Sequence, residues 1–502
     1  MRLLTRMGAA GLALYLAGPV AVGLRGLGVP FPLVIVLSVG ALGAGATVLV
    51  RRMPQGSDSR ALRPALVAAW IVLLVAAVFQ VTRLSVFMHD VKRVSYSVLP
   101  DDPWRLQHSC LTAYAEAARF VSGDTDNVYD AELYENRRLG PLRVDTFHYP
   151  PPFLLLPAAV RVIAVDYFSI RRIWFALQSV LLVSALLWIA LWIGGAEGRL
   201  AAAATVVVLA APQTVFTLQI GNFQVTAICA AMMATALIAS GRIGVGSSVL
   251  AFVTAGKIFP GVLGVYLSGA RQWRAVLTTA VCGLVFTAVA GAAFGANDFS
   301  AFFGYELPRI VSGEAFPQAE RPFTMVPNQS VYGLVTKVRS LGATGLDQAV
   351  TLQIAAAYGY LVIAVSLLLG LTRARFAEPA PGRDRLEHAQ LWLALLNLAS
   401  FRSPFVGAGY GSVGTVWLLS LLIVGARTRA RRALWVALTV CLFTFMRIVQ
   451  GPLPGTVPTA AAFAVSAAFD VLLLLTNFSV VGASFVRALR ARKDSSRAIA
   501  TV

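Results

Sequence analysis

Repeated apolar segments of about 20 residues constrain the fold of this chain more than any other feature, because a helix needs about that length to cross a bilayer. Of the 502 residues, 58% are hydrophobic and only 13% are charged, whereas soluble domains have about 45–50% apolar and about 25% charged residues. The sequence therefore predicts an all-α polytopic membrane protein with about 12–13 transmembrane helices. We expect helices near residues 7–23, 29–50, 63–83, 173–195, 200–213, 222–240, 275–293, 348–371, 388–403, 410–426, 433–450 and 459–487.

The first apolar run resembles a cleaved leader, because Arg2 and Arg6 precede it. A second apolar run, 29–50, follows almost at once and ends at two arginines. This pattern is typical of a retained helical hairpin rather than of a signal peptide.

Residues 244–270 contain a break within an otherwise apolar segment. The sequence GKIFP at Gly256–Pro260 places a glycine, a lysine and a proline within five residues, and a continuous transmembrane helix tolerates these poorly. The segment is therefore either one interrupted crossing or a re-entrant pair of half-helices. The stretch 151–165 is also predicted to enter the membrane and return, because about 14 apolar residues are too few for a full crossing.

The arginines predict how the chain is oriented. If residues 244–270 form a re-entrant pair, the arginine clusters that flank the apolar segments all lie on one face of the membrane. The positive-inside rule makes this face cytoplasmic. These clusters are Arg51, Arg52, Arg60, Arg63, Arg199, Arg242, Arg271, Arg274, Arg373, Arg375, residues 427–432 and the tail 490–493. We therefore expect both termini inside. The net charge of +19 is then an orientation signal and does not predict nucleic-acid binding.

This orientation divides the chain into five predicted parts. They are N-terminal transmembrane helices at 1–83, an extracytoplasmic loop at 84–149, core helices at 150–293, a second outer loop at 294–346 and C-terminal transmembrane helices at 347–502. The first loop holds ten of the 23 acidic residues and three of the four histidines, and its residues 111–121 have a helical composition. Chemistry is therefore expected in this partly helical loop.

Three aspartates in this loop are candidate catalytic bases. Asp101 and Asp102 are adjacent, and Asp145 lies just before His148 and Tyr149, which begin the sequence HYPPP. A carboxylate can take the proton of an acceptor hydroxyl while a neighbouring group orients it. We expect His148 and Tyr149 to contact the substrate. The alternative is that these acids are solvated loop residues.

Lys257 is the strongest candidate for binding an anion. A lysine at the centre of an apolar segment costs about 2.5–3.5 kcal/mol and needs a partner. That partner is either a lipid phosphate or a carboxylate such as Asp470, or else the side chain extends to the membrane surface. Arg171, Arg172 and Arg402 run against the inside bias, so they either bind the same phosphate or anchor lipid headgroups.

Four amides stand at predicted outer helix ends: Asn222, Gln224, Asn328 and Gln329. Amides in such positions either donate hydrogen bonds to sugar hydroxyls or cap broken helices. No cofactor is expected. The four cysteines have no metal-ligand spacing, and the chain has no glycine-rich phosphate loop. His108 and His148 lie near acids and could form a metal site, but no ligand spacing supports one.

Five short motifs occur in the order found in bacterial GT-C membrane glycosyltransferases. They are YPPP at Tyr149–Pro152, GNFQ at Gly221–Gln224, KIFP at Lys257–Pro260, NQS at Asn328–Ser330 and the pair Ser403–Pro404. The chain most closely resembles the family 87 polyprenyl-phosphate-mannose-dependent α-mannosyltransferases, over roughly residues 95–425. The resemblance implies a GT-C-like helical bundle, a polyprenyl-phosphate-sugar donor, an active site on the outer face and inversion at the anomeric carbon.

The resemblance also implies an aspartate of the first outer loop as the base. The stretch AYAEAA at 113–118 is similar to the family sequence that follows this aspartate, but Gln107, His108 and Ser109 stand where it is expected. The base is then one of the three candidate aspartates. After Ser403–Pro404 the sequence reads FVGAGY, without the Trp/His/Tyr pattern common in the family.

The sequence thus predicts an integral-membrane hexosyltransferase of the bacterial inner membrane. A sugar, mannose by resemblance, moves from a polyprenyl-phosphate donor to a glycolipid or glycan acceptor of the cell envelope. The base deprotonates the acceptor, and Lys257 with one or more arginines stabilises the departing phosphate. Besides donor and acceptor, the expected partner is membrane lipid.

Two other classes fit parts of the pattern. A transporter or flippase for a lipid-linked or anionic solute also has broken helices with polar groups at their ends. Transporters are commonly built from matching halves, however, and only the first half of this chain has a large outer loop. A membrane scaffold would leave Lys257 unexplained.

Overall fold

The computed structural model describes residues 2–38, 40, 64–121, 125–372, 379–449 and 459–500. Nearly all regular structure is helical, which confirms the all-α prediction. The one sheet among the described residues is a hairpin of β1 (Arg138–Leu139) and β2 (Leu142–Arg143), paired antiparallel with Arg138 opposite Arg143.

The chain forms two compact units, whose boundaries fall inside three helices, α10, α13 and α15. Unit 1 comprises Met1–Cys229 and Thr287–Leu307. Its helices are α1 (Arg2–Gly26), α3 (Pro64–His89), η1 (Val94–Tyr96), α4 (Pro103–Gln107), α5 (Cys110–Phe120), η2 (Ala131–Leu133), η3 (Pro151–Leu154), α6 (Leu155–Ile163), α7 (Tyr167–Ile193), α8 (Gly195–Ala210), α9 (Pro212–Ile220), the start of α10 (Phe223–Ala239), the end of α13 (Trp273–Phe294), α14 (Asn297–Ala301) and η4 (Phe302–Glu306).

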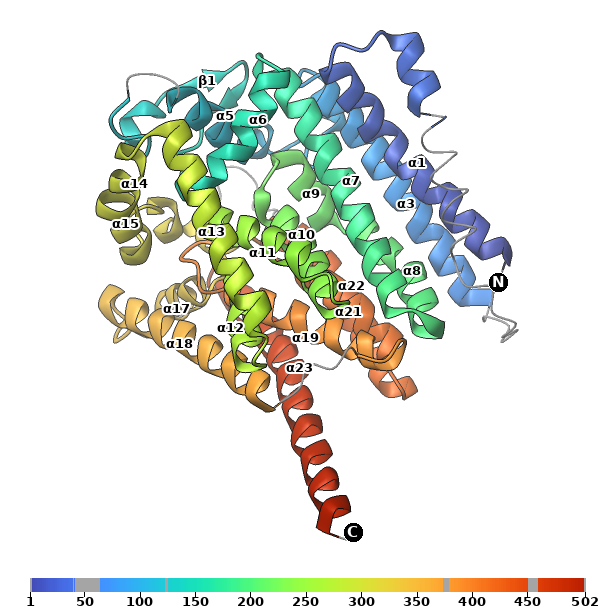
Figure 1. The fold of residues 1–502 in the computed structure, drawn as a ribbon. Helices are drawn as coiled ribbons and strands as arrows, with labels where there is room; N and C mark the ends of the chain where they lie inside the picture. Colours follow the sequence, from blue (N-terminus) through green and yellow to red (C-terminus); the bar gives the residue numbers. More distant parts are fainter. Residues whose placement is uncertain are drawn as a thin grey trace. The chain divides into compact units, whose positions relative to one another are not determined.

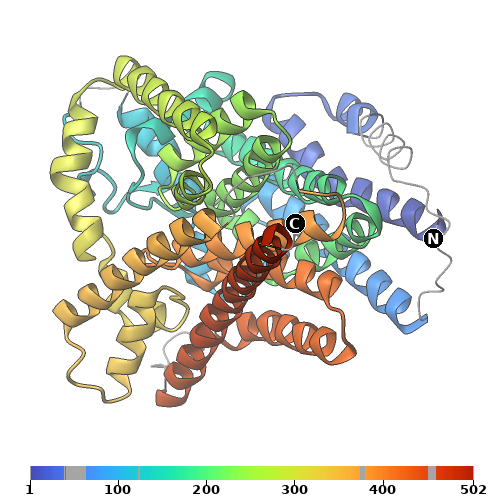
Figure 2. The ribbon, with the colours of Figure 1, turned by 60° about the horizontal axis from the view of Figure 1, so that its bottom comes forward.

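Unit 2 comprises Ala230–Phe286 and Pro308–Val502. Besides the remainder of α10 and α13, its helices are α11 (Ile243–Gly256), α12 (Gly261–Gly269), α15 (Leu307–Ser312), η5 (Pro317–Glu320), α16 (Pro322–Met325), α17 (Val331–Ser340), α18 (Gln348–Thr372), α19 (Arg383–Ser400), α20 (Ala408–Gly411), α21 (Val413–Gly425), α22 (Arg429–Val449) and α23 (Ala460–Ala500). The long C-terminal helix α23 extends past the helices of unit 2 that it packs against (Figure 2).

Long helices lie side by side in unit 1, where α1 packs against both α3 and α7 (Figure 1). Small residues allow these close approaches. A Cβ added at Gly18 would meet the side chain of Ser85 on α3, and one at Gly23 would meet the Ala176 methyl of α7 at 2.5 Å. Close backbone packing through small residues is the usual way in which helices associate in a membrane.

Seven helices of the described residues are long and apolar enough to cross a membrane, or eight if the bent pair α8 and α9 is one span. The seven are Met7–Gly26, Pro64–His89, Tyr167–Ile193, Trp273–Phe294, Gln348–Thr372, Ala408–Gly425 and Ala460–Arg490. The predicted segments 222–240, 388–403 and 433–450 are also helical, as α10, α19 and α22, but they are not among the seven. Most of the predicted helix 29–50 and the arginines at 51, 52, 60, 63, 373 and 375 lie outside the described residues.

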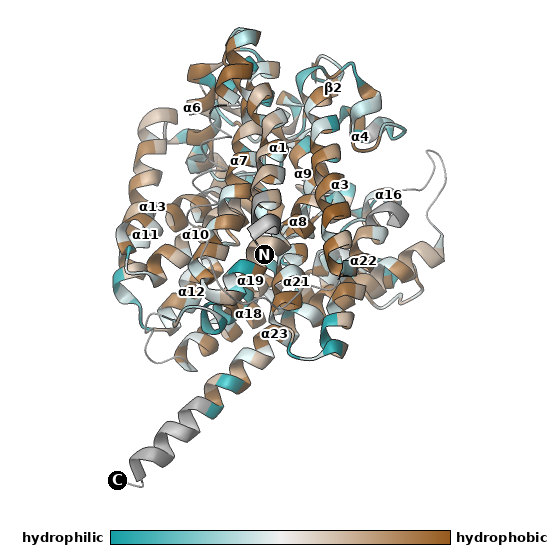
Figure 3. Cartoon of the chain, turned by 90° about the vertical axis from the view of Figure 1, so that its right-hand side faces the viewer, coloured by the Kyte–Doolittle hydropathy of each residue, from teal (hydrophilic) through white to brown (hydrophobic). Residues whose placement is uncertain are grey.

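Helices α3 and α13 are coloured mainly as hydrophobic in Figure 3, and several of their apolar side chains are exposed. On α13, Leu277 is 63% exposed and Leu284 is 70% exposed, and on α3, Val72 is 66% exposed. Apolar faces of this extent require a cover other than water. Lipid is the natural cover for helices of membrane-spanning length.

The predicted break at GKIFP and the predicted helix at 111–121 are confirmed, whereas the membrane re-entry of residues 151–165 stays a prediction. Helix α11 ends at Gly256 and α12 begins at Gly261, so the chain is interrupted at GKIFP. The predicted helix at 111–121 is α5, and the short apolar segment 151–165 forms η3 and α6.

Two segments are more helical than expected. The predicted loop 294–346 contains short helices from α14 to α17. Helix α9 follows α8 after a bend of 62° at Ala211–Pro212, where the prediction ends a helix. Proline at the first helical position suits the start of α9, because its missing N–H would have no helical partner there.

Candidate functional site

The polar centre of unit 1 forms where the chain leaves α4 and enters α5. His108 is extended between the two helices, and Cys110 is the first residue of α5. Asp145 reaches the same place from the segment that follows β2, because its backbone N–H donates to the buried Thr112 hydroxyl at 3.0 Å. Thr112 itself donates to the Ser109 carbonyl at 2.7 Å, so the start of α5 positions the aspartate.

The side chains of His108, Cys110 and Asp145 are in contact. His108 Nδ1 lies 3.2 Å from Asp145 Oδ1, and His108 Nε2 lies 3.7 Å from Cys110 Sγ. The side chains of His108 and Asp145 are 19% and 28% exposed, so a substrate can reach them. Burial lowers the pKa of His108, but Asp145 and Cys110 raise it by more, and the pKa lies well above the usual value. The imidazole is therefore protonated near neutral pH.

Asn222 joins this centre to the turn between α9 and α10. Its amide Nδ2 donates to Cys110 Sγ at 3.3 Å, and its Oδ1 accepts from the Gln224 backbone N–H at 2.8 Å. Gln224 is buried, and its Nε2 has no hydrogen-bond partner among the described residues. The predicted Asn222 and Gln224 thus lie together, with Asn222 capping α10 and also touching the centre.

Aromatic rings surround the YPPP segment, whose prolines begin η3. The hydroxyls of Tyr149 and Tyr114 are 2.7 Å apart, and Tyr129 donates from its hydroxyl to the Tyr149 carbonyl at 3.0 Å. Tyr149 stacks on Phe153 with ring centroids 4.6 Å apart, and Phe153 meets the edge of Phe223 at 4.8 Å. Of these rings only Tyr149 is partly exposed, so the buried rings position Tyr149, whose ring can pack against a sugar.

His148 has an acidic partner that the sequence analysis did not identify. Its Nδ1 lies 2.6 Å from Glu306 Oε1, and the Glu306 side chain is fully buried. The two residues are 158 positions apart, so no local pattern could have linked them. Asp298, close to Glu306 in sequence, is also buried, and burial raises the pKa of its carboxyl to about 6.

Asp101 and Asp102 lie at the start of α4. Asp102 is the N-cap, accepting from the Arg105 backbone N–H at 3.2 Å, and its Oδ2 lies 2.9 Å from Arg105 Nε. Burial lowers the pKa of Arg105 to about 10, although Asp102 opposes this. Asp101 is exposed. The Asp102 carboxylate is thus occupied by the helix that it caps.

Arg171 and Arg172 both hold the end of α3. The buried Arg171 donates from Nη1 to the Phe87 carbonyl at 3.0 Å and lies over the Phe87 ring at 4.8 Å. Arg172 donates to the His89 carbonyl at 3.1 Å. Both guanidinium groups neutralise the carbonyl end of a helix, a favourable place for a cation. Their predicted binding of phosphate stays a prediction.

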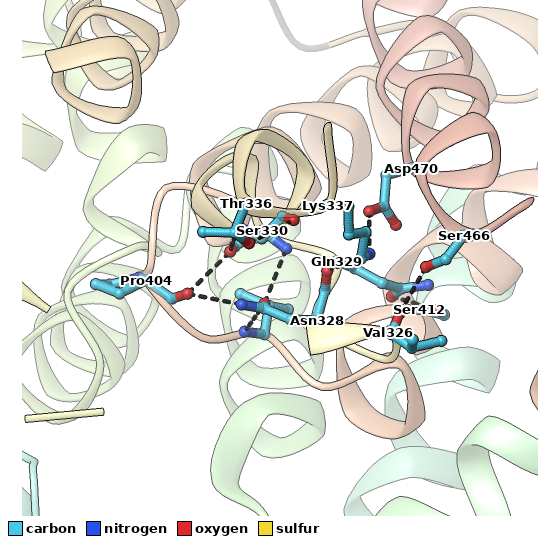
Figure 4. Close-up of polar contacts among 12 residues, drawn as sticks. Val326, Asn328, Gln329, Ser330, Thr336, Lys337, Pro404, Ser412, Ser466 and Asp470 are labelled. Carbon is cyan, nitrogen blue, oxygen red and sulfur yellow. Dashed lines mark hydrogen bonds and ion pairs between the residues drawn. The ribbon is translucent and has the colours of Figure 1, made fainter. Parts of the chain in front are cut away.

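In unit 2, the predicted amides Asn328 and Gln329 belong to a buried polar network (Figure 4). Asn328 Nδ2 donates to the Pro404 carbonyl at 2.9 Å, and its Oδ1 accepts from the Val406 backbone N–H at 2.9 Å. Gln329 Oε1 accepts from the Ser412 hydroxyl at 2.7 Å. These contacts tie the NQS motif to the segment after Ser403–Pro404, so two of the five motifs support each other.

Lys337 and Asp470 form a buried ion pair in the same network, joining α17 to α23 (Figure 4). Lys337 also donates to the Asn328 carbonyl at 2.7 Å. Both charged side chains are almost completely inaccessible to water. The carboxylate that the sequence analysis considered for Lys257 is therefore the partner of Lys337.

Lys257 follows the last residue of α11, at the predicted break, and its ammonium lies 5.6 Å from the ring centre of Tyr410. A cation over a tyrosine ring is stabilised by the ring's quadrupole. Arg402, half-buried, packs along α18, where its Cδ would meet a Cβ added at Gly359 at 2.9 Å. These are the two predicted cations of unit 2.

The model of the family described as glycosyltransferase family 87 matches residues 147–400, half of the chain. This chain belongs to glycosyltransferase family 87. Neither a curated protein nor a solved structure matches it. Membership in family 87 means a membrane glycosyltransferase with a sugar donor and an acceptor, and the apolar helices agree with a multi-pass membrane protein.

The family 87 match contains most of the predicted substrate-binding residues, from His148 and Tyr149 to Asn328 and Gln329. It begins at residue 147, so Asp101, Asp102, His108 and Asp145 precede it. The candidate base of this glycosyltransferase must therefore be argued from geometry. Cys110, Glu306 and Lys337 were not predicted as members of polar clusters. The partners of Glu306 and Lys337 are distant in sequence, and Cys110 does not belong to any recognised ligand spacing.

Proposed function

We propose that this family 87 glycosyltransferase transfers mannose from a polyprenyl-phosphate donor to a glycolipid or glycan acceptor of the bacterial cell envelope, with inversion at the anomeric carbon. The family match supports sugar transfer. A lipid-linked donor agrees with the membrane-spanning helices, because the leaving phosphate then stays in the bilayer.

The contact of Asp145 with His108 is the observation that carries the mechanism. The protonated His108 donates to Asp145 Oδ1 and orients the carboxylate. The other carboxylate oxygen accepts the proton of the acceptor hydroxyl, whose oxygen attacks the anomeric carbon as the phosphate departs. Of the three candidate aspartates, Asp145 fits best. Asp145 and Asp102 are equally exposed and each has a cationic partner, but both carboxylate oxygens of Asp102 contact Arg105 at the start of α4.

The residues around Asp145 supply the sugar contacts in this proposal. His148, Tyr149, Asn222 and Gln224 belong to unit 1 with Asp145, and the unpaired amide of Gln224 is a donor for a sugar hydroxyl. In unit 2, Lys257 binds the donor phosphate, as its charge and its place at a helix break suggest. Asn328, Gln329, Arg171, Arg172 and Arg402 keep their predicted substrate-binding roles as proposals.

The proposed orientation places this chemistry on the extracytoplasmic face and both termini in the cytoplasm. The support is the arginine distribution, because clusters such as Arg271, which precedes α13, and Arg274, in its first turn, fall on one side under the positive-inside rule.

Single substitutions of the three aspartates test the proposal. Asp145→Asn keeps the side-chain shape but removes the base, and we expect about a 10²–10⁴-fold loss of transfer. Membranes that contain each variant are supplied with radiolabelled polyprenyl-phosphate mannose, and labelled glycolipid or glycan is counted. Asp101→Asn should retain most activity, and Asp90→Asn, which alters an exposed acid outside the centre, is the matched control.

Undiminished transfer by Asp145→Asn would contradict the mechanism. Loss of transfer on Asp102→Asn alone, with normal protein levels, would move the base to Asp102. A wild-type chain that transfers no sugar from any polyprenyl-phosphate donor, but does so from another donor class, would overturn the proposed substrate.

A further inference from the structure

The centre of unit 1 brings together three kinds of metal-binding donor. One ligand atom each from His108, Cys110 and Asp145 can be chosen so that all lie within 4.8 Å of one another. The three side chains are partly exposed, so an ion can reach them. No ligand spacing in the sequence indicates this group, because His108 and Cys110 are two residues apart and Asp145 follows 35 residues later.

We propose that His108, Cys110 and Asp145 form a binding site for a thiolate-preferring divalent transition metal, with Zn²⁺ as the natural occupant. Sulfur, imidazole nitrogen and carboxylate oxygen are the donors that Zn²⁺ takes in proteins. Mg²⁺ and Ca²⁺ prefer sites made only of oxygen, so a cysteine ligand selects against them. This proposal replaces the expectation from sequence that the chain binds no metal.

The distances between the donors are close to those of a tetrahedral site. Ligands at about 2.0–2.3 Å from Zn²⁺ lie about 3.3–3.7 Å from one another. Only one ring nitrogen of His108 can bind the ion. Nε2 is 3.7 Å from Cys110 Sγ and Nδ1 is 3.2 Å from Asp145 Oδ1, so one of these two pairs is already at this spacing, and the third donor lies within 4.8 Å. Small side-chain rotations close the longest separation, leaving the fourth position for water or another ligand.

A fourth residue supports the site from outside. Asn222 Nδ2 donates to Cys110 Sγ at 3.3 Å, and a donor of this kind stabilises the negative charge of a metal-bound thiolate. Asn222 is itself buried and held by its bond from the Gln224 backbone N–H. The amide is therefore oriented in advance, as outer-shell partners of metal ligands usually are.

The metal and the proposed base compete for the same carboxylate. When Zn²⁺ binds, the ligating nitrogen of His108 gives up its proton, and the Asp145 oxygen on the ion no longer accepts the proton of an acceptor. Bound Zn²⁺ therefore inhibits transfer. This consequence rests on the proposed function, whereas metal binding itself does not. Zn²⁺ binding and sugar transfer are therefore measured separately, so that failure of the metal site can be distinguished from failure of the proposed function.

Metal binding is tested on the purified full-length protein in detergent after removal of metals with a chelator. Zn²⁺ is titrated in competition with a chromophoric chelator. We expect one tight site in the wild type. In Cys110→Ser the affinity should fall by more than the roughly 10–100-fold that loss of an outer-shell partner costs. The matched control is Cys441→Ser, which changes an exposed cysteine of α22 and should bind as the wild type does.

Co²⁺ provides a readout that does not depend on the stability of a variant. Bound to the wild type, it should show a thiolate-to-cobalt charge-transfer absorption that is retained in Cys441→Ser and absent from Cys110→Ser. A wild type that binds no more Zn²⁺ than Cys110→Ser, or a Co²⁺ complex without a thiolate band, would overturn the site. Tight Zn²⁺ binding without inhibition of transfer would keep the site and remove the proposed role of Asp145.

Discussion

Single residues in the interior carry charges that the local sequence does not explain. The sequence marks Asp145 and His108 as polar loop residues, but only the structure shows that they touch, because the start of α5 holds both. Lys337 lies in a short helix with other polar residues and looks like a surface lysine, yet it is buried against Asp470 of α23. In each case the partner is distant along the chain, which is why a sequence pattern could not supply the pair.

The buried pair of Lys337 and Asp470 predicts a large effect of single changes. Lys337→Met or Asp470→Leu alone leaves one buried charge without its partner, and we expect about 3–5 kcal/mol of destabilisation. The double variant removes both charges and should be closer to wild type in stability. Thermal unfolding in detergent measures all three. Single variants as stable as the wild type would contradict the pair.

The raised pKa of His108 predicts a pH-dependent contribution to stability. Because the folded state binds the proton more tightly than the unfolded state, the contact with Asp145 stabilises fully below the unfolded histidine pKa of about 6.5, and this is lost as pH rises through the folded value. Asp145→Asn should therefore lower the unfolding temperature more at about pH 6 than at about pH 10. An equal decrease at both values would exclude a charged His108.

Among the secondary-structure elements, the sequence predicted most of the helices but only some of the breaks between them. Most predicted helices lie within a few residues of the observed ones, because apolar length determines them. GKIFP was recognised as a break from its lysine and proline. The bend at Ala211–Pro212 was not predicted, because the apolar composition continues through it. The short helices after α13 were predicted as a loop, because their stretch has no long apolar segment.

The turn between α9 and α10 makes a prediction about Gly221. Its φ of +69° is left-handed, and an added Cβ would lie 3.1 Å from the Leu111 Cβ. Gly221→Ala should destabilise by about 1–2 kcal/mol and reduce transfer by shifting Asn222 away from Cys110. Gly264→Ala in α12 is the control, since nothing lies within 4 Å of its added Cβ. Equal unfolding temperatures for the two variants would argue against a strained turn.

For the whole molecule, composition and hydropathy alone predict a polytopic membrane protein, and the helices confirm it. The family was also foreseen from the order of the motifs. Orientation remains an inference from arginines, and it predicts a cytoplasmic C-terminus. A fluorescent reporter that folds only in the cytoplasm, fused after Val502, should fluoresce. An alkaline phosphatase fused at the same place should be inactive, and the opposite result would reverse the orientation.

The central claim is that Asp145 takes the acceptor proton during sugar transfer from a lipid phosphate. The most direct test is single-turnover transfer by purified protein, with labelled polyprenyl-phosphate mannose in excess and metal chelated. We predict that wild type forms product of inverted anomeric configuration, and that Asp145→Asn retains donor binding but forms product about 10²–10⁴-fold more slowly. Equal rates for the two proteins, or product of retained configuration, would contradict the account.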